Sequence, residues 1–169
     1  MWSLFFLVVT GRAQQQDDLT AEEYEAVFEI LYGISKTAPF DVKTTEGMHY
    51  RRYVAQHERR HGGESPEARK VVWRTAGVSD GKGFVFVSHT GEIYPSGFLP
   101  ISAGNVRRDS LVEIYRRSPL FQSLRDTDLR QGKCGLCEYR KLCGGSRARA
   151  YALTGNYLAE DPRCVYQPV

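Results

Sequence analysis

The stretch Cys134-Gly-Leu-Cys137-Glu-Tyr-Arg-Lys-Leu-Cys143-Gly-Gly145 carries all but one of the 4 cysteines in this chain of 169 residues, and Cys164 is the last. The spacing is therefore Cys-x2-Cys-x5-Cys-x20-Cys. Four thiolates that meet at one point can bind zinc, bind an iron-sulfur cluster or close two disulfides. The choice among these three decides whether the C-terminal half of the chain is a zinc module, an iron-sulfur domain or a disulfide-bonded domain.

The spacing favours an iron-sulfur cluster over zinc. A structural zinc site usually has two short knuckles, but this chain has one, with a third cysteine after five residues and a fourth behind a predicted helix. A cubane cluster is larger than one ion and can collect thiolates from separate loops. Gly135, Gly144 and Gly145 let the backbone come close enough for amide groups to donate hydrogen bonds to sulfur. Zinc remains the alternative, in a zinc-stabilised structural or interaction module.

The residues between Cys143 and Cys164 predict the structure that brings the last cysteine to the other three. We call the four cysteines and the residues between them the array. Ser146 to Leu153 is expected to be helical, with Gly155 as its C-cap, and Asp161-Pro162 then leads to Cys164. Arg147 and Arg149 are expected to cap that helix or to be solvated, although cationic neighbours would raise the potential of a cluster.

Upstream of the array, the sequence predicts a β-hairpin and two helices. Residues 84–88 and 92–94 are strand-like and flank the turn His89-Thr-Gly91. Asp109-Ser110 is an N-cap for a first helix, and Ser118-Pro119 begins a second one.

The first 50 residues predict a strand, a helix and a second strand. The apolar run 2–9 is rich in Phe, Val and Leu, which is typical of a buried parallel strand. Thr20-Ala-Glu-Glu23 is a capping box, and residues 40–45 alternate as a strand does. The helix presents one apolar stripe, formed by Tyr24, Val27, Phe28, Leu31 and Ile34. A single βαβ unit lacks neighbours for its strands, so this part is expected to belong to a larger α/β sheet or barrel.

The apolar run at the amino terminus is not expected to be an export signal or a membrane span. It lacks a preceding positive charge and an Ala-x-Ala-like cleavage pattern, and it is far shorter than the roughly 20 residues that cross a bilayer. We therefore expect a cytoplasmic protein without membrane contact, whose cysteines are ligands rather than disulfides. The net charge of +3, from 23 basic and 20 acidic residues, is too balanced to imply a nucleic-acid partner.

Three ordered segments resemble the auxiliary-cluster (SPASM or twitch) domain of radical S-adenosylmethionine (SAM) proteins. They are Gly81-Lys-Gly-Phe-Val-Phe-Val-Ser-His-Thr-Gly-Glu-Ile-Tyr-Pro95, Gly104-Asn-Val-Arg-Arg-Asp-Ser-Leu-Val-Glu-Ile-Tyr115 and the array from Cys134 to Cys164. The resemblance covers roughly residues 78–168. The first 50 residues resemble, more weakly, the last strand and helix of the radical SAM partial barrel.

Two departures from the SPASM pattern bear on the cofactor. The full pattern has a cysteine after the hairpin and another four residues after the third cysteine of the array, and this chain has Ser96 and Arg147 there. Both changes fall on the ligands of the first auxiliary cluster. The resemblance therefore implies one [4Fe-4S] cluster with four protein ligands, formed by Cys134, Cys137, Cys143 and Cys164. Such a cluster has no open iron site, which favours electron transfer or a structural role.

The Cys-x3-Cys-x2-Cys motif that binds the catalytic cluster and SAM in this family has no counterpart, because all four cysteines are already assigned. The triplet Gly62-Gly63-Glu64 is interpreted as a chance match to the family's SAM-amine motif. The resemblance implies the C-terminal part of a truncated or split radical SAM protein that is not active alone. SAM would bind only in a complete or reassembled protein, whose partners are the missing barrel as a separate chain and an electron donor such as ferredoxin or flavodoxin.

The predicted fold class is α+β, with a SPASM-like hairpin and helices around the cysteine-ligated cluster, after a β-α-β remnant of a (β/α)6 barrel. Residues 1–55 are assigned to the barrel part, 56–77 to a linker and 78–169 to the auxiliary domain. The linker is placed by the polar, basic composition of residues 51–70, which predicts a loose loop. The histidines, His49 among them, are expected in loops or a turn without a metal or acid/base role.

Overall fold

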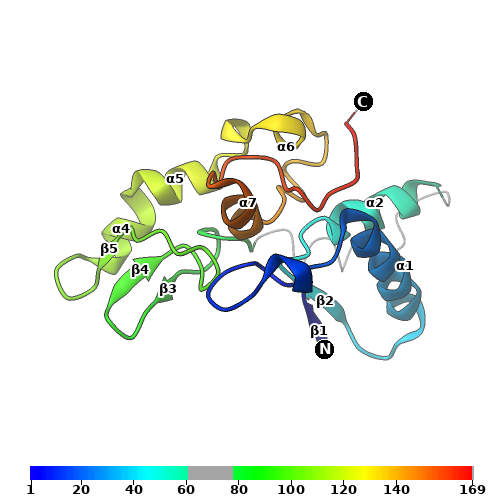
Figure 1. Ribbon diagram of the computed structural model, residues 1–169, viewed down its shortest axis with the longest axis horizontal. Helices are drawn as coiled ribbons and strands as arrows, with labels where there is room; N and C mark the ends of the chain where they lie inside the picture. Colours follow the sequence, from blue (N-terminus) through cyan, green and yellow to red (C-terminus); the bar gives the residue numbers. More distant parts are fainter. Residues whose placement is uncertain (61–77, 169) are drawn as a thin grey trace.

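The computed structural model describes residues 1–60 and 78–168 of the chain (Figure 1). Strand β1 (Trp2–Phe5) pairs in parallel with β2 (Val42–Thr45), and Trp2 lies opposite Val42. Helix α1 (Ala21–Thr37) connects the two strands, so the predicted strand-helix-strand unit is confirmed. A short 3-10 turn, η1 (Gln15–Asp17), precedes the helix.

Helix α1 begins and packs as its sequence predicts. The Thr20 hydroxyl accepts a hydrogen bond from the Glu23 backbone N–H, and the Glu23 side chain accepts one from the Thr20 N–H, which completes the capping box. The apolar stripe faces a core shared with β2, with Phe6 and with a second helix, α2 (Tyr50–Arg60). The buried members of this core are Phe6, Tyr24, Phe28, Leu31, Val42, Tyr50, Tyr53 and Val54.

Two expectations for this part of the chain are wrong. The strand at the amino terminus is shorter than residues 2–9 and is not buried, because Trp2 is 41% and Phe5 67% exposed. Among the described residues β1 pairs only with β2, so no second strand covers its other edge. Residues 50–60 are also helical rather than a loose loop. The rest of the proposed linker, together with Gly62-Gly63-Glu64, lies outside the described residues.

The predicted hairpin is present and carries a third strand. Strand β3 (Phe86–Val87) pairs antiparallel with β4 (Glu92–Tyr94), and β4 pairs antiparallel with β5 (Gly104–Asn105). The sequence did not predict β5. Its residue Asn105 is held from both sides, because its amide donates to the Glu92 carboxylate at 2.7 Å while its backbone N–H donates to Asp109 at 2.8 Å.

Short helices follow the hairpin. They are α4 (Leu111–Arg117), α5 (Pro119–Arg125), the 3-10 turn η2 (Thr127–Leu129), α6 (Gly132–Leu136) and α7 (Arg147–Thr154). The predicted N-cap Ser110, the Pro119 start and the left-handed C-cap Gly155 are all confirmed. Helix α6, which contains Cys134, was not predicted. None of the described helices is long and apolar enough to span a membrane.

Helix α7 lies near the centre of the molecule, between the two sheets (Figure 1). A second core forms beside it from Val8, Leu99, Leu124 and Ala148. Val8 comes from the segment after β1, whereas the other three come from residues 99–148. The mixed helix and strand architecture agrees with the expected α+β class.

Candidate iron-sulfur site

The structure brings all four predicted cysteines to one recess. Cys134 lies in α6, Cys137 at its C-cap, Cys143 in the following turn and Cys164 in the C-terminal segment. All four are free thiols and partly buried. The recess holds about 380 Å³ of empty space, open solvent included, and is also lined by His49, Arg52, Tyr139 and Asp161, among others. In residues 1–60 and 78–168, no three His, Cys, Asp or Glu side chains lie close enough together to hold a single metal ion, so the four thiols line the recess without converging on one point.

Two adjacent glycines let the loop after Cys143 turn tightly beside the sulfurs. Gly144 and Gly145 adopt φ of 69° and 65°, in the left-handed region. A Cβ on Gly145 would lie 3.4 Å from the Cys134 Sγ and 2.9 Å from the Asp161 Cβ. The Gly145 backbone N–H donates to the Cys143 Sγ at 3.4 Å, as predicted for these glycines. A second backbone donor, the Asp161 N–H, points at the Cys134 Sγ at 3.4 Å.

The thiols are held in surroundings that disfavour their charged form. Burial raises the pKa of Cys143, Cys164 and Cys137, and the neighbouring Cys134 adds to this effect at each of them. The same thiols receive backbone hydrogen bonds, which lower the pKa. Arg52 acts in the opposite direction at Cys164 and Cys137, and a metal ion bound by the thiolates would favour the charged form further.

Buried guanidinium groups surround the recess, and the sequence did not predict them. Arg52 lines it, pairs with Glu25 through an Nη1–Oε2 contact of 3.0 Å and stacks over Tyr166. Arg51 donates to the Val78 carbonyl at 2.9 Å and to the Leu142 carbonyl, next to Cys143, at 3.4 Å. Both arginines come from α2, in the stretch whose polar composition suggested a loop.

Helix α7 contributes two more guanidinium groups, and the expectation that they are caps or solvated is wrong. Arg147 is 1% exposed and Arg149 is fully buried. Arg147 places its Nη2 3.9 Å from the Cys134 Sγ and donates through Nη1 to the Tyr157 carbonyl at 3.0 Å. The cap of this helix is Ser146, whose hydroxyl accepts from the Arg149 backbone N–H at 3.0 Å.

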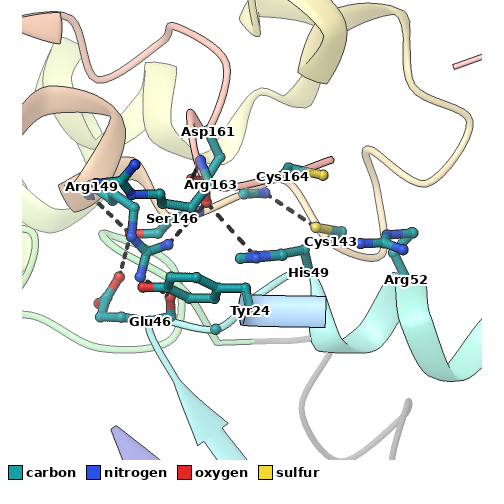
Figure 2. A network of polar contacts seen from close by, with 12 residues as sticks. Tyr24, Glu46, His49, Arg52, Cys143, Ser146, Arg149, Asp161, Arg163 and Cys164 are labelled. Carbon is teal, nitrogen blue, oxygen red and sulfur yellow. Dashed lines mark hydrogen bonds and ion pairs between the residues drawn. The ribbon is translucent and has the colours of Figure 1, made fainter. Parts of the chain in front are cut away.

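A buried polar network connects the recess to the N-terminal part of the chain (Figure 2). Arg149 pairs with Asp161 through an Nη1–Oδ2 contact of 3.2 Å and donates to the Glu46 carbonyl at 2.6 Å. Its guanidinium also lies over the Tyr24 ring, 4.7 Å from the centroid. Burial alone would raise the pKa of Asp161, but Arg149, the Ser146 N–H and Arg147 hold it below its usual value.

His49 belongs to this network, although no local pattern in the sequence predicted it. It is fully buried, lines the recess and places its Nδ1 3.9 Å from the Asp161 Oδ2. Burial lowers the pKa of His49 to about 3, so its ring is neutral at physiological pH. Neutral imidazole beside the recess adds no cation to the site.

Glu46 lies at the far end of the network, after β2. Its φ of 58° is in the left-handed region, and its Oε2 accepts a hydrogen bond from the Ser146 hydroxyl at 2.5 Å. Burial, and then the charge of Asp80, raises the pKa of Glu46 to about 8. Glu46 also lines a second cavity with about 920 Å³ of empty space, open solvent included. Ser96 lies on this second cavity, away from the four cysteines.

Comparison with known proteins agrees with this site. Residues 79–140 match the SPASM family, described as an iron-sulfur cluster-binding domain, and this range includes Cys134 and Cys137. The chain is 41% identical over 168 residues to the AdoMet-dependent heme synthase of Methanosarcina barkeri, a match that covers 99% of this chain and 48% of that protein. It is 42% identical over 170 residues to the enzyme of the same name from Nitratidesulfovibrio vulgaris, covering 99% and 46%.

A more distant relative matches the same domain. The PqqA peptide cyclase of Gluconobacter oxydans is 40% identical over 87 residues, which cover 51% of this chain and 23% of the cyclase. The chain spans about half the length of the heme synthases that it matches. These matches show that the chain belongs to the radical SAM/SPASM proteins and corresponds to their C-terminal part, which contains the iron-sulfur cluster-binding domain.

Proposed function

We propose that Cys134, Cys137, Cys143 and Cys164 together bind one [4Fe-4S] cluster. The observation that carries this proposal is the arrangement of four free thiols around one recess, at the end of a domain that matches an iron-sulfur cluster-binding family. The donor set consists of sulfur alone, which suits iron-sulfur chemistry. The backbone N–H groups of Gly145 and Asp161 point at two of these sulfurs, where their hydrogen bonds would stabilise cluster-bound thiolates.

The buried arginines support an anionic group in the recess. A guanidinium removed from water is strongly destabilising unless an anion compensates it. Arg130 is 7% exposed, and its Nε and Nη1 have no hydrogen-bond partner among the described residues. Disulfides are neutral and would leave these cations uncompensated, whereas a thiolate-bound metal centre carries negative charge. The site therefore fits a metal centre better than a pair of disulfides.

When bound, a [4Fe-4S] cluster supplies one-electron transfer. Four protein thiolates leave it no open iron for a substrate, so we propose electron transfer or structural support as its role. The residues of this chain hold the thiolates, partly bury Cys143 and present compensating charge.

For the complete protein we propose an activity of the kind that the relatives' names describe, AdoMet-dependent heme synthesis. The support is identity of 41% and 42% along nearly the whole chain. Such chemistry requires a SAM-binding barrel, which we propose pairs with the open edge of β1. That strand pairs only with β2 among the described residues, which leaves an edge for a further parallel strand. It also exposes Trp2 and Phe5, as expected where the helices of a larger parallel sheet would cover its faces. Reduction would need a separate electron donor such as ferredoxin or flavodoxin.

Anaerobic reconstitution of the chain with iron and sulfide tests the cluster proposal. We expect about four irons and four acid-labile sulfides per chain, with broad visible absorbance. Replacement of Cys143 by Ser should abolish stable incorporation, whereas Ser96→Ala, which leaves all four thiols, should not. Stoichiometric zinc without sulfide would contradict the proposal and would support a zinc-stabilised interaction module instead.

A further inference from the structure

Two buried guanidinium groups, neither of which lines the recess directly, act on its Cys134 side. Arg147 places its Nη2 3.9 Å from the Cys134 Sγ, and Arg130 interacts electrostatically with both Cys134 and Arg147. Arg130 is fixed by one hydrogen bond, from its Nη2 to the Leu124 carbonyl at 2.6 Å. Its Nε and Nη1 have no partner among the residues that the structure describes.

The charges of these two arginines are not neutralised by a salt bridge. The hydrogen bonds of Arg147 go to backbone carbonyls and to the thiol of Cys134. Within residues 1–60 and 78–168, neither Arg147 nor Arg130 lies in an ion pair with a carboxylate. Arg149 and Arg52, in contrast, pair with Asp161 and Glu25. Asp80 and Asp126 act on Arg130, and Asp161 acts on Arg147, only from beyond ion-pair distance. Positive charge without a directly paired carboxylate is therefore concentrated on one side of the recess.

This arrangement is costly unless an anion accompanies it. Burial, and then the proximity of Arg147, lowers the pKa of Arg130 to about 10, which shows that the two cations disfavour each other. A thiolate at Cys134 would compensate both.

We propose that Arg147 and Arg130 raise the reduction potential of the cluster bound at Cys134, so that the site accepts an electron readily. This inference rests on the proposed cluster. Reduction adds one electron, and so one negative charge, to a centre that is already anionic, and no bond forms or breaks. A fixed positive charge in a buried, low-dielectric site favours the more negative state. The electron would come from a one-electron donor, and dithionite can supply it in the experiment.

The test is the reduction potential of the reconstituted full chain, measured by spectroelectrochemical titration. The variants are Arg147→Gln, Arg147→Lys and Arg130→Gln, with the exposed Arg116→Gln of α4 as control. Iron and sulfide content and the EPR spectrum of the reduced state are recorded for each, so that only intact clusters are compared. The titration is repeated at high salt, which screens exposed charges far more than buried ones.

We expect Arg147→Gln and Arg130→Gln to lower the potential, each by at least a tenfold change in the equilibrium constant for reduction, or about 59 mV for one electron. Arg147→Lys keeps the charge and should restore most of the difference, and the Arg116→Gln potential should equal that of the wild type. The shifts should persist at high salt.

An unchanged potential in Arg147→Gln with an intact cluster would overturn the inference, as would equal shifts in the Lys and Gln variants. If Arg147→Gln cannot retain a cluster, Arg130→Gln decides, because it preserves the carbonyl contacts of Arg147. These outcomes are distinct from failure of the proposed function, in which the wild-type chain itself takes up no cluster.

Discussion

At the scale of single residues, Gly145 in the loop after Cys143 is required for two separate reasons, which a comparison with Gly155 at the end of α7 makes clear. Gly145 and Gly155 both adopt left-handed backbone conformations, with φ of 65° and 74°. A Cβ on Gly155 would meet nothing within 4 Å, whereas one on Gly145 would lie 2.5 Å from the Arg147 Nη2 and 2.9 Å from the Asp161 Cβ. The two positions therefore share a backbone requirement, but only Gly145 also has a steric one.

Alanine substitutions separate these two requirements. Gly155→Ala should lower the free energy of unfolding by about 1 kcal/mol, the cost of a left-handed conformation for a residue with a Cβ. Gly145→Ala should cost more and should also lower the iron content after reconstitution, because it displaces Arg147 and Asp161 beside Cys134. Urea unfolding and iron analysis of both variants measure this. Equal losses in the two variants would show that the close approach at Gly145 is unimportant.

Glu46 makes the stability of the folded chain depend on pH. Its pKa of about 8 lies above the ordinary value of 4.5, so the folded chain binds its proton more tightly than the unfolded chain does. The stability that this proton provides is fully present below about pH 4.5 and is lost as the pH rises through about 8. The groups that contribute are Asp80, Asp161, Ser146 and Arg149, besides burial itself.

Glu46→Gln should remove this dependence, because the amide cannot ionise. The variant should gain stability relative to the wild type as the pH rises from 5 to 9, by more than about 1 kcal/mol, since one pKa unit corresponds to about 1.4 kcal/mol. Urea unfolding across this range, with both proteins in the same metal state, measures the difference. A difference that stays constant with pH would contradict a raised pKa at Glu46.

At the scale of elements, α1 is the helix most fully specified by its own sequence. Its start is fixed by reciprocal hydrogen bonds between Thr20 and Glu23, and its stripe packs into the first core. Helix α2 is different, because it buries Arg51, Arg52 and Glu58, which local periodicity places among solvated residues. Its stability depends on partners elsewhere in the chain, such as Glu25.

The cap of α1 can be tested alone. Thr20→Ala should lower the free energy of unfolding by about 1 kcal/mol, because the Glu23 N–H loses its acceptor. Thr37→Ala, at the exposed last residue of the same helix, provides the matched control and should change stability little. A loss of equal size at both ends would indicate that helix propensity, not capping, determines the effect.

At the scale of the whole molecule, residues 1–60 complete the surroundings of the cysteines. Arg163, next to Cys164, pairs with Asp18 through an Nε–Oδ2 contact of 2.8 Å, and Arg149 donates to the Leu7 carbonyl at 3.3 Å. Val8 packs in the core beside α7. His49 and Arg52 line the recess itself.

These contacts predict that the auxiliary domain does not hold its cluster well by itself. A chain of residues 78–169, reconstituted beside the full chain, should lose visible absorbance several-fold faster on exposure to a chelator. The full chain with Asp18→Asn should lie between the two, because only the Arg163 pair is broken. If the short chain retains its cluster as long as the full chain does, residues 78–169 form an independent cluster-binding unit.

The positions of helices and turns followed well from local signals. The Thr20 capping box, the Ser110 N-cap, Pro119 and Gly155 each fix the backbone within a few residues, so they were predictable without tertiary information. Strand β5 and helix α6 were missed because they are only two and five residues long. Helix α2 was missed because its strongly polar composition suggested a loop, although Tyr50, Tyr53 and Val54 recur at helical spacing.

The sequence by itself determined which residues would gather, namely four cysteines at a spacing typical of a cluster, and the family to which the chain belongs. Only the tertiary structure decided the surroundings of those cysteines. Buried arginines come from α2, α7 and the segment before α6, and the neutral His49 directly precedes α2. All of them appear in sequence as ordinary polar residues. The reason is physical: whether a charge is solvated or buried depends on which elements pack around it, and no local pattern records that packing.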